Sequence, residues 1–323
     1  MAQFLTSQVI QRLITGFPEQ AYVDVSLAKY SRWRVGGTAR CMVLPASESE
    51  FLRCVRLCHD CDISFVILGA TSNLLFSDQG LGVLGISLAR LNSVQIEGNK
   101  VVAQAGNWVP HFARKLASEG LSGLEHIVGI PGSLGGLLYM NGGSQRKGIG
   151  SHVLGVKTVN RRGEELSYTQ DECEFAYRHS GFQAGEEIIF EVEFQLAAEA
   201  PEKVRSEMLS ILRSRRKKFP LRLPNCGSVF VSNPAMYEEY GPPGAVIESC
   251  KLKGVSIGGA QVSPEHANFI VNNGGATALD ILKLIKKVQA EVHKRTGYNM
   301  VSEVRYMAEN GDTRPAATVE SLC

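Results

Sequence analysis

The sequence predicts an α+β fold in two domains, and three observations support this prediction. The chain has 323 residues, a length that suits two domains of ordinary size. Over its first two-thirds, short runs of β-branched residues alternate with segments that carry helix start and stop signals. A charged helix then ends at Pro220, and the shorter remainder again mixes strand and helix patterns. We therefore expect a larger and a smaller α+β domain.

The predicted strands are β-branched runs bounded by glycine or polar turn residues. They cover residues 64–69, 82–88, 101–106 and 187–196, and a hairpin over 156–166 turns at Arg162-Gly163. The predicted helices begin at capping residues and end at glycine or proline. Their ranges and caps are 48–61 (Ser47 with Glu50), 108–120 (Asn107), 201–218 and 278–296 (Thr277 with Asp280).

Composition excludes several classes of protein. Hydrophobic residues make up 44% and charged residues 20%, which rules out a disordered or fibrous chain. The 34 Lys and Arg residues nearly balance the 32 Asp and Glu residues, so a nucleic-acid partner is not expected. The sequence shows no signal-peptide pattern and no apolar run long enough to cross a bilayer. We expect a cytoplasmic protein without a membrane partner, whose eight cysteines are reduced.

Glycine-rich segments are the main candidates for ligand binding. One follows the strand over 64–69 and reads GATSNLL from Gly69; the other reads GIPGSLGG from Gly129 and is soon followed by Asn141. Small residues leave backbone N–H groups uncrowded, and such groups can hold phosphate oxygens. Neither segment is a Walker or a Rossmann motif, and the alternative for each is a tight turn without a ligand. The candidate cofactor residues are Gly69, Ala70, Thr71, Ser72, Asn73, Gly129, Pro131, Gly132, Ser133, Gly135, Gly136 and Asn141.

GATSNLL resembles the pyrophosphate loop of flavoenzymes of the vanillyl-alcohol oxidase type. Further motifs narrow the resemblance to the UDP-N-acetylenolpyruvoylglucosamine reductases, and it spans about residues 30–307. These motifs are GIPGSLGG, AYRHS, NCGSVF, LKGVSIGGAQVSPEHANFIVN and SEVRYM. The short stretch between Ser180 and Lys218 lacks a tyrosine-bearing insertion, which is similar to the second class of these enzymes.

The resemblance implies a domain organisation and an activity. It implies an FAD-binding domain over 20–200, with lobes of about 20–90 and 91–200, and a substrate-binding domain over 201–307. The last strand of the latter is expected to return to the FAD site, and residues 308–323 are expected to be a flexible tail. NADPH would reduce the bound FAD. The FAD is expected to be bound non-covalently, because Gly69–Asn73 contains no His or Cys to which a flavin could be tethered. The flavin would then reduce an enolpyruvyl UDP-sugar in peptidoglycan synthesis, with roles in cell shape and division, in a monomeric protein.

Three residues match the catalytic positions of this family. Arg178 offers a planar guanidinium that can pair with the substrate carboxylate while charge develops there. Ser228 matches the proton donor and Glu303 the carboxyl group that completes the site. The alternatives are a surface ion pair for Arg178, a backbone-bonded strand-end serine for Ser228, and an ion pair with Arg305 for Glu303.

Four residues match positions that bind the UDP-sugar, namely Lys218, Asn233, Lys253 and His266. The family commonly has a lysine after G-S-V/F-F, where this chain reads Val231-Ser232, so other residues must supply part of the positive charge. Two further signals are set aside. The cysteines at 54, 58 and 61 fit one packed helix face better than a zinc site, and a Cys226 nucleophile is not required by the expected chemistry. An oxygen-using oxidase of the same fold and a non-catalytic binding protein remain as alternative functions.

Overall fold

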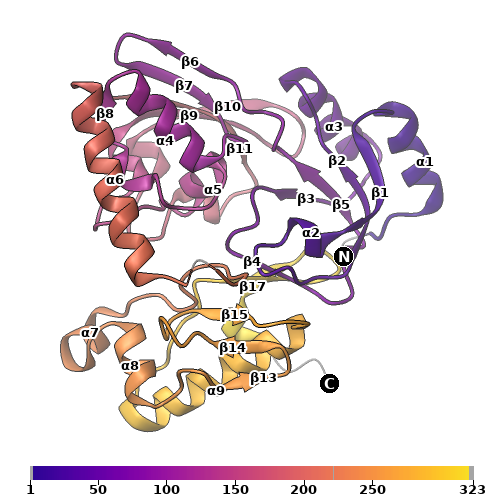
Figure 1. The fold of residues 1–323 in the computed structure, drawn as a ribbon. Coiled ribbons are helices and arrows are strands. Elements are labelled where there is room, and N and C mark those ends of the chain that lie inside the picture. The colour runs from indigo at the N-terminus through magenta and orange to yellow at the C-terminus, as the bar shows by residue number, and fades with distance from the viewer. Residues whose placement is uncertain (1–2, 221, 320–323) are drawn as a thin grey trace.

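We describe a computed structural model of the chain, covering residues 3–220 and 222–319. Two lobes lie side by side above a C-terminal domain (Figure 1). The first lobe holds a four-stranded sheet in the order β1-β2-β5-β3, where β1 is antiparallel to β2 and the other pairs are parallel. Its elements are α1 (Ser7–Gly16), β1 (Ala21–Ser26), α2 (Leu27–Tyr30), β2 (Thr38–Val43), α3 (Glu48–Asp60), β3 (Phe65–Leu68) and β5 (Leu84–Ser87).

The second lobe is built on a five-stranded antiparallel sheet in the order β10-β9-β11-β7-β6. Its strands are β6 (Val94–Glu97), β7 (Lys100–Gln104), β9 (Val153–Val159), β10 (Glu165–Thr169) and β11 (Ile188–Gln195), with the short pair β8 (Leu121–Ser122) and β12 (Ala197–Ala198). The helices are α4 (Val109–Ser118), α5 (Leu134–Tyr139) and α6 (Pro201–Lys218). The sequence predictions of these strands and of the hairpin are confirmed.

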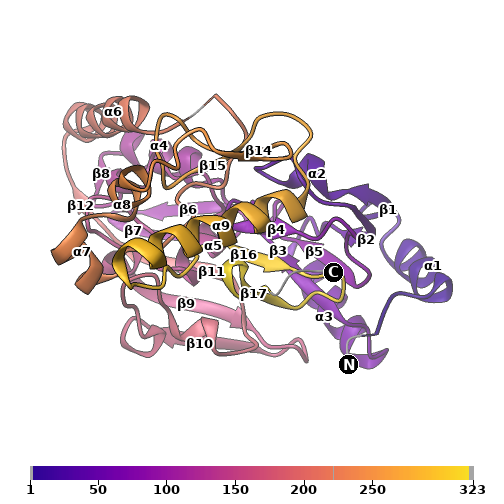
Figure 2. The ribbon, with the colours of Figure 1, turned by 90° about the horizontal axis from the view of Figure 1, so that it is seen from below.

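The C-terminal domain is a small sheet covered by helices. It contains α7 (Pro234–Tyr240), α8 (Pro243–Ser249), β13 (Ser256–Ile257), β14 (Ala260–Val262), β15 (Ile270–Asn272) and α9 (Ala278–Thr296). The predicted capping box is present, because Thr277 accepts from Asp280 N–H while the Asp280 carboxylate accepts from Thr277 N–H. Helix α9 packs on β13 and β14 and runs across the lower face of the molecule (Figure 2).

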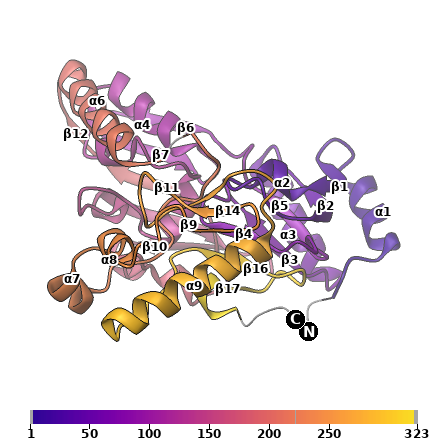
Figure 3. The same ribbon diagram turned by 60° about the horizontal axis from the view of Figure 1, so that its bottom comes forward.

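Contacts between distant parts of the chain join the C-terminal domain to the first lobe. Strand β16 (Arg305–Met307) pairs in parallel with β4 (Leu74–Phe76), which directly follows the first glycine-rich segment. The buried Trp33 indole donates a hydrogen bond to the carbonyl of Ile270 at 2.7 Å. The Asp78 carboxylate accepts from the first two N–H groups of α9, at 2.8 and 3.1 Å. In Figure 3, α9 runs along the lower part of the view, below the lobe that carries α4 and α6 and the lobe that carries α1.

Three expectations need correction. Asn107 does not cap α4, because its side chain donates to the carbonyls of Ser93 and Gln104 and the capping position is Trp108. Helix α6, expected at the start of the substrate-binding domain, packs its apolar face into the core of the second lobe. The expected flexible tail is wrong for its described part, since β17 (Thr313–Pro315) pairs with β16 and Ala316 is fully buried. Residues 320–323 lie outside the described part of the chain.

Candidate active site

The two glycine-rich loops meet at Ser133. The N–H of Ala70 donates to the Ser133 hydroxyl at 3.3 Å, and the same hydroxyl caps α5 through Gly136 N–H at 3.4 Å. A Cβ atom at Gly69 would lie 2.4 Å from that hydroxyl oxygen, which is closer than any real contact. A larger residue at position 69 would therefore displace the Ser133 hydroxyl that joins the two loops.

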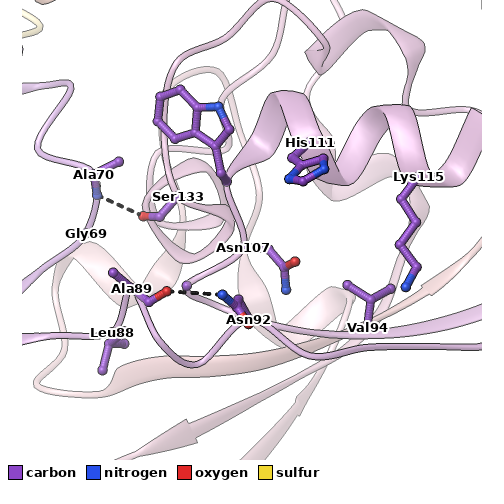
Figure 4. Close-up of a pocket in the computed structure, with 12 residues that line it drawn as sticks. Gly69, Ala70, Leu88, Ala89, Asn92, Val94, Asn107, His111, Lys115 and Ser133 are labelled. Atoms are coloured by element: carbon purple, nitrogen blue, oxygen red, sulfur yellow. Dashed lines mark hydrogen bonds between the residues drawn. The ribbon is translucent and has the colours of Figure 1, made fainter. Parts of the chain in front are cut away.

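A cavity of about 440 Å³ opens beside this junction (Figure 4). Its wall includes one face of α4, from which Trp108, His111 and Lys115 contribute side chains. The Trp108 ring is 40% exposed, so it presents an aromatic surface on which a planar ligand can stack. The other lining residues are Gly69, Ala70, Leu88, Ala89, Asn92, Val94, Gly106, Asn107 and Ser133.

Several expected cofactor residues use their side chains to hold the protein together. The Thr71 hydroxyl donates to the carbonyl of Tyr30 at 2.6 Å, and the Asn73 amide donates to the carbonyl of Glu303 at 2.9 Å. The Asn141 amide donates to the carbonyl of Ala176 at 2.9 Å, while its oxygen accepts from Gly150 N–H. The Thr71 hydroxyl and one N–H group of the Asn73 amide are therefore used within the protein.

Arg178 lies in a tight turn. Ala176 and His179 exchange two backbone hydrogen bonds of 3.1 Å, so Tyr177 and Arg178 form the tip of the turn. Arg178 has a φ of +56°, a left-handed conformation that costs a residue other than glycine roughly 1 kcal/mol. The surrounding structure must hold the residue in this conformation. The neighbouring residue His179 is exposed.

Arg178 and Glu303 form an ion pair between remote segments. Arg178 Nε lies 2.9 Å from Glu303 Oε1, although its N–H is not aimed along a hydrogen-bond direction. The two side chains are 28% and 17% exposed. Burial raises the pKa of the Glu303 carboxyl, and Arg178 acts in the opposite direction without cancelling the shift. The alternative partner Arg305 instead donates to the carbonyl of Thr313.

Ser228 is brought to the same place by backbone pairing. Glu303 N–H donates to the carbonyl of Val229 at 2.8 Å, and Phe230 and Ser302 form an antiparallel bridge. Asn268 fixes this segment from the other side, because its side chain exchanges hydrogen bonds of 3.0 and 2.9 Å with the backbone of Phe230. Gly227 precedes Ser228 with a φ of +82°. Ser228 therefore follows a glycine turn and directly precedes Val229, which is hydrogen-bonded to Glu303.

The expected UDP-sugar residues come from separate elements. Lys218 is exposed at the end of α6, and Lys253 pairs with Glu248 at 2.8 Å. His266 packs on Phe219 and Phe269, and burial lowers its pKa. Asn233 has a capping role instead, accepting from Met236 N–H at the start of α7.

Two alternatives are weakened by burial. Burial raises the pKa of the Cys226 thiol to about 12, so it remains protonated and does not suit a nucleophile. Cys54 and Cys58 are buried in the core of the first lobe, as the packing interpretation expects. Among residues 3–220 and 222–319, no group of three or more potential ligands is arranged to hold a metal. No helix in these ranges is long and apolar enough to cross a membrane.

Comparison with known proteins agrees with this geometry. Residues 39–169 match the model of an FAD binding domain, and residues 219–307 match the C-terminal domain of UDP-N-acetylenolpyruvoylglucosamine reductase. The lobes and the glycine loops thus define an FAD-binding flavoprotein. The chain is 44% identical to UDP-N-acetylenolpyruvoylglucosamine reductase 1 of Corynebacterium glutamicum, over 92% of this chain and 89% of that protein. It belongs to the UDP-N-acetylenolpyruvoylglucosamine reductase family.

Two further relatives support the assignment. The reductase of Pediococcus pentosaceus is 37% identical over 93% of this chain and 98% of its own length. The crystal structure of the UDP-N-acetylenolpyruvylglucosamine reductase from Thermus caldophilus superimposes with a TM-score of 0.75 at 28% identity, covering 89% of this chain and 98% of that one. The predicted fold class is therefore confirmed.

Sequence reasoning missed some residues of this region. Trp108, His111 and Lys115 follow a spacing of three and four residues, which places them on one helix face and was a usable signal. Arg215 was not among the predicted site residues, yet its guanidinium stacks on Phe219 and its stem lies against Gly129 of the second loop. Asn268 gave no signal, since a single asparagine has no characteristic spacing.

Proposed function

We propose that this protein is an NADPH-dependent flavoenzyme of the cytoplasm that reduces an enolpyruvyl UDP-sugar, UDP-N-acetylglucosamine enolpyruvate, to UDP-N-acetylmuramate. The observation that carries the proposal is the ion pair between Arg178 and Glu303, on strands and turns that converge beside the first glycine loop. Family membership supports the substrate. NADPH as the reductant and a monomeric chain are further parts of the proposal.

The residues present fit an FAD molecule. Gly69, Ala70 and Ser133 place only small side chains on their part of the cavity wall, and the partly exposed Trp108 offers a stacking surface. The Ser72 hydroxyl has no hydrogen-bond partner among the described residues and stands near Gly132 of the second loop, so it is available to a ligand. Non-covalent binding is supported by the high pKa of the nearby Cys226 thiol. When bound, the flavin supplies the hydride that reaches C3 of the enolpyruvyl group.

Arg178 and Glu303 would stabilise the charge that this addition creates. Negative charge develops on the substrate carboxylate as an enediolate, and a guanidinium keeps its positive charge throughout. Because burial raises the pKa of Glu303, its carboxyl group holds a proton more readily than an exposed glutamate. A protonated Glu303 would donate a hydrogen bond to the same enediolate, while Arg178 faces a charged oxygen.

Ser228 would deliver the proton to C2. A serine hydroxyl is a very weak acid, so this role depends on a fixed position over the developing carbanion. The pairing of Val229 with Glu303 and the clamp from Asn268 support such a position. Lys218 and Lys253, with the nearby Arg215, would supply positive charge to the diphosphate in place of the lysine that this chain lacks after Phe230.

An absorbance spectrum followed by two additions tests the function. The purified protein should show bound flavin, NADPH should bleach it in the absence of oxygen, and the enolpyruvyl UDP-sugar should restore the colour. Rapid recovery in air without the sugar would instead indicate an oxidase. Colour that NADPH never bleaches would indicate a binding protein. Flavin that stays with the denatured polypeptide would contradict non-covalent binding.

The Ser228→Ala variant tests the mechanism. We expect reduction by NADPH to be unchanged and reoxidation by the sugar to fall by about 10²- to 10⁴-fold, the usual contribution of a positioned acid. Stopped-flow absorbance separates the two half-reactions. Ser256→Ala is a suitable control, because Ser256 lies on β13 with its hydroxyl facing only the carbonyl of Gly254. Full-speed reoxidation in Ser228→Ala would contradict the role of this serine.

A further inference from the structure

Hydrogen bonds join the turn that carries Arg178 to the C-terminal end of helix α5. The Ser180 hydroxyl, fully buried, donates to the carbonyl of Tyr139 at 2.8 Å. The Asn141 amide, two residues further along, donates to the carbonyl of Ala176 at 2.9 Å. Both ends of the turn are therefore tied to one short segment, Tyr139–Asn141, that follows the second glycine loop.

Gln183 contacts the backbone of Arg178 itself. Its amide nitrogen donates to the carbonyl of Arg178 itself at 3.0 Å and to the carbonyl of Tyr139 at 2.8 Å. One side chain thus uses both of its N–H groups to bridge the strained residue and the end of α5. Because Arg178 is in the left-handed conformation, its backbone adopts that geometry only while neighbouring contacts hold it.

Helix α5 also reaches the first glycine loop. Its capping residue Ser133 contacts Ala70 N–H at 3.3 Å, and its last residue, Tyr139, accepts from Gln183 and Ser180. The six residues of α5 form one rigid element between the proposed cofactor loops and the Arg178 turn. A change at Gln183 therefore alters the position of the guanidinium relative to those loops without touching either ligand.

We propose that Gln183 is a positioning residue. By bonding Arg178 to the end of α5, it fixes the position of the Arg178 guanidinium relative to the cofactor loops. This proposal rests on the proposed function, because it concerns the half-reaction in which Arg178 acts. Gln183 touches no reacting atom, and its effect is transmitted by the backbone of Arg178. Misplacing a catalytic group by about 1 Å commonly costs on the order of 100-fold in rate.

Two substitutions distinguish hydrogen bonding from packing. Gln183→Met keeps a similar length and removes both donors, whereas Gln183→Lys keeps a donor group that can reach both carbonyls. We expect Gln183→Met to slow flavin reoxidation by the enolpyruvyl UDP-sugar by about 10- to 100-fold, mainly in kcat, while reduction by NADPH stays within twofold. Gln183→Lys is expected to recover most of the lost rate.

The control is Gln170→Met, since the Gln170 amide makes a similar bond to a backbone carbonyl, that of Gly150, and does not contact the Arg178 turn. Flavin content and thermal unfolding of each variant report on folding. Wild-type protein that fails both half-reactions would overturn the proposed function. Normal wild-type protein with a Gln183→Met variant that reoxidises at full speed, or loses both half-reactions equally, would overturn the positioning role alone.

Discussion

Replacing Arg178 by methionine removes the guanidinium from a partly buried pair. At the observed separation of 2.9 Å, two unit charges attract by roughly 6 kcal/mol at an effective dielectric constant of about 20. Much of this attraction offsets the cost of burying the charges, so the pair contributes far less than that to folding. Without Arg178, burial acts alone on Glu303, and the pKa of its carboxyl rises further. The carboxyl then takes up a proton, which limits the loss of stability.

The effect on catalysis is expected to be larger. A single preorganised group that faces developing charge is typically worth about 10²- to 10³-fold, or roughly 3–4 kcal/mol. We expect Arg178→Met to slow reoxidation by the enolpyruvyl UDP-sugar by that factor, measured by stopped-flow absorbance, and to leave reduction by NADPH unchanged. Arg178→Lys should recover only part of the rate, because an ammonium group cannot pair with two oxygens in one plane. Reoxidation of Arg178→Met within threefold of wild type would refute the assignment.

Two further predictions concern stability and cofactor binding. Burial lowers the pKa of His126 to about 4, and both ring nitrogens lack partners among the described residues. The free energy of unfolding should therefore fall by up to ~3 kcal/mol as the pH drops from about 6.5 to 4. In this pH range only the unfolded chain takes up the proton. Urea unfolding of His126→Leu should show a weaker pH dependence, and an unchanged one would contradict this. Gly69→Ala should lower flavin content, since its Cβ would lie 2.4 Å from Ser133 Oγ, whereas Gly16→Ala, with open space around it, should retain normal content.

The family motifs identify the residues of the candidate site from the sequence. The sequence analysis placed Arg178, Ser228 and Glu303 in one site by resemblance alone, and the structure brings Arg178 and Glu303 within 2.9 Å. An ion pair with Arg305 was the alternative role for Glu303. Alternation along a strand permits the Arg305 pairing, and only the packed structure excludes it, because Arg305 is turned toward Thr313.

The amino-acid sequence alone determined the features that depend on near neighbours. Helix α9 is an example, because the Thr277 and Asp280 capping box and the terminal Gly297 act within a few residues of one another. The glycines of the two loops were visible for the same reason, since a close approach or a turn selects glycine locally.

Only the tertiary structure decided how polar side chains are used. Thr71 and Asn73 are candidate cofactor residues in the sequence. In the folded chain their side chains donate to the carbonyls of Tyr30 and Glu303. The described part of the tail looked unable to dock, but β16 presents an open edge with which β17 pairs. Such partners come from remote parts of the chain. The type of a polar residue shows that it needs a hydrogen-bond partner when buried, but it does not identify which distant carbonyl that partner is.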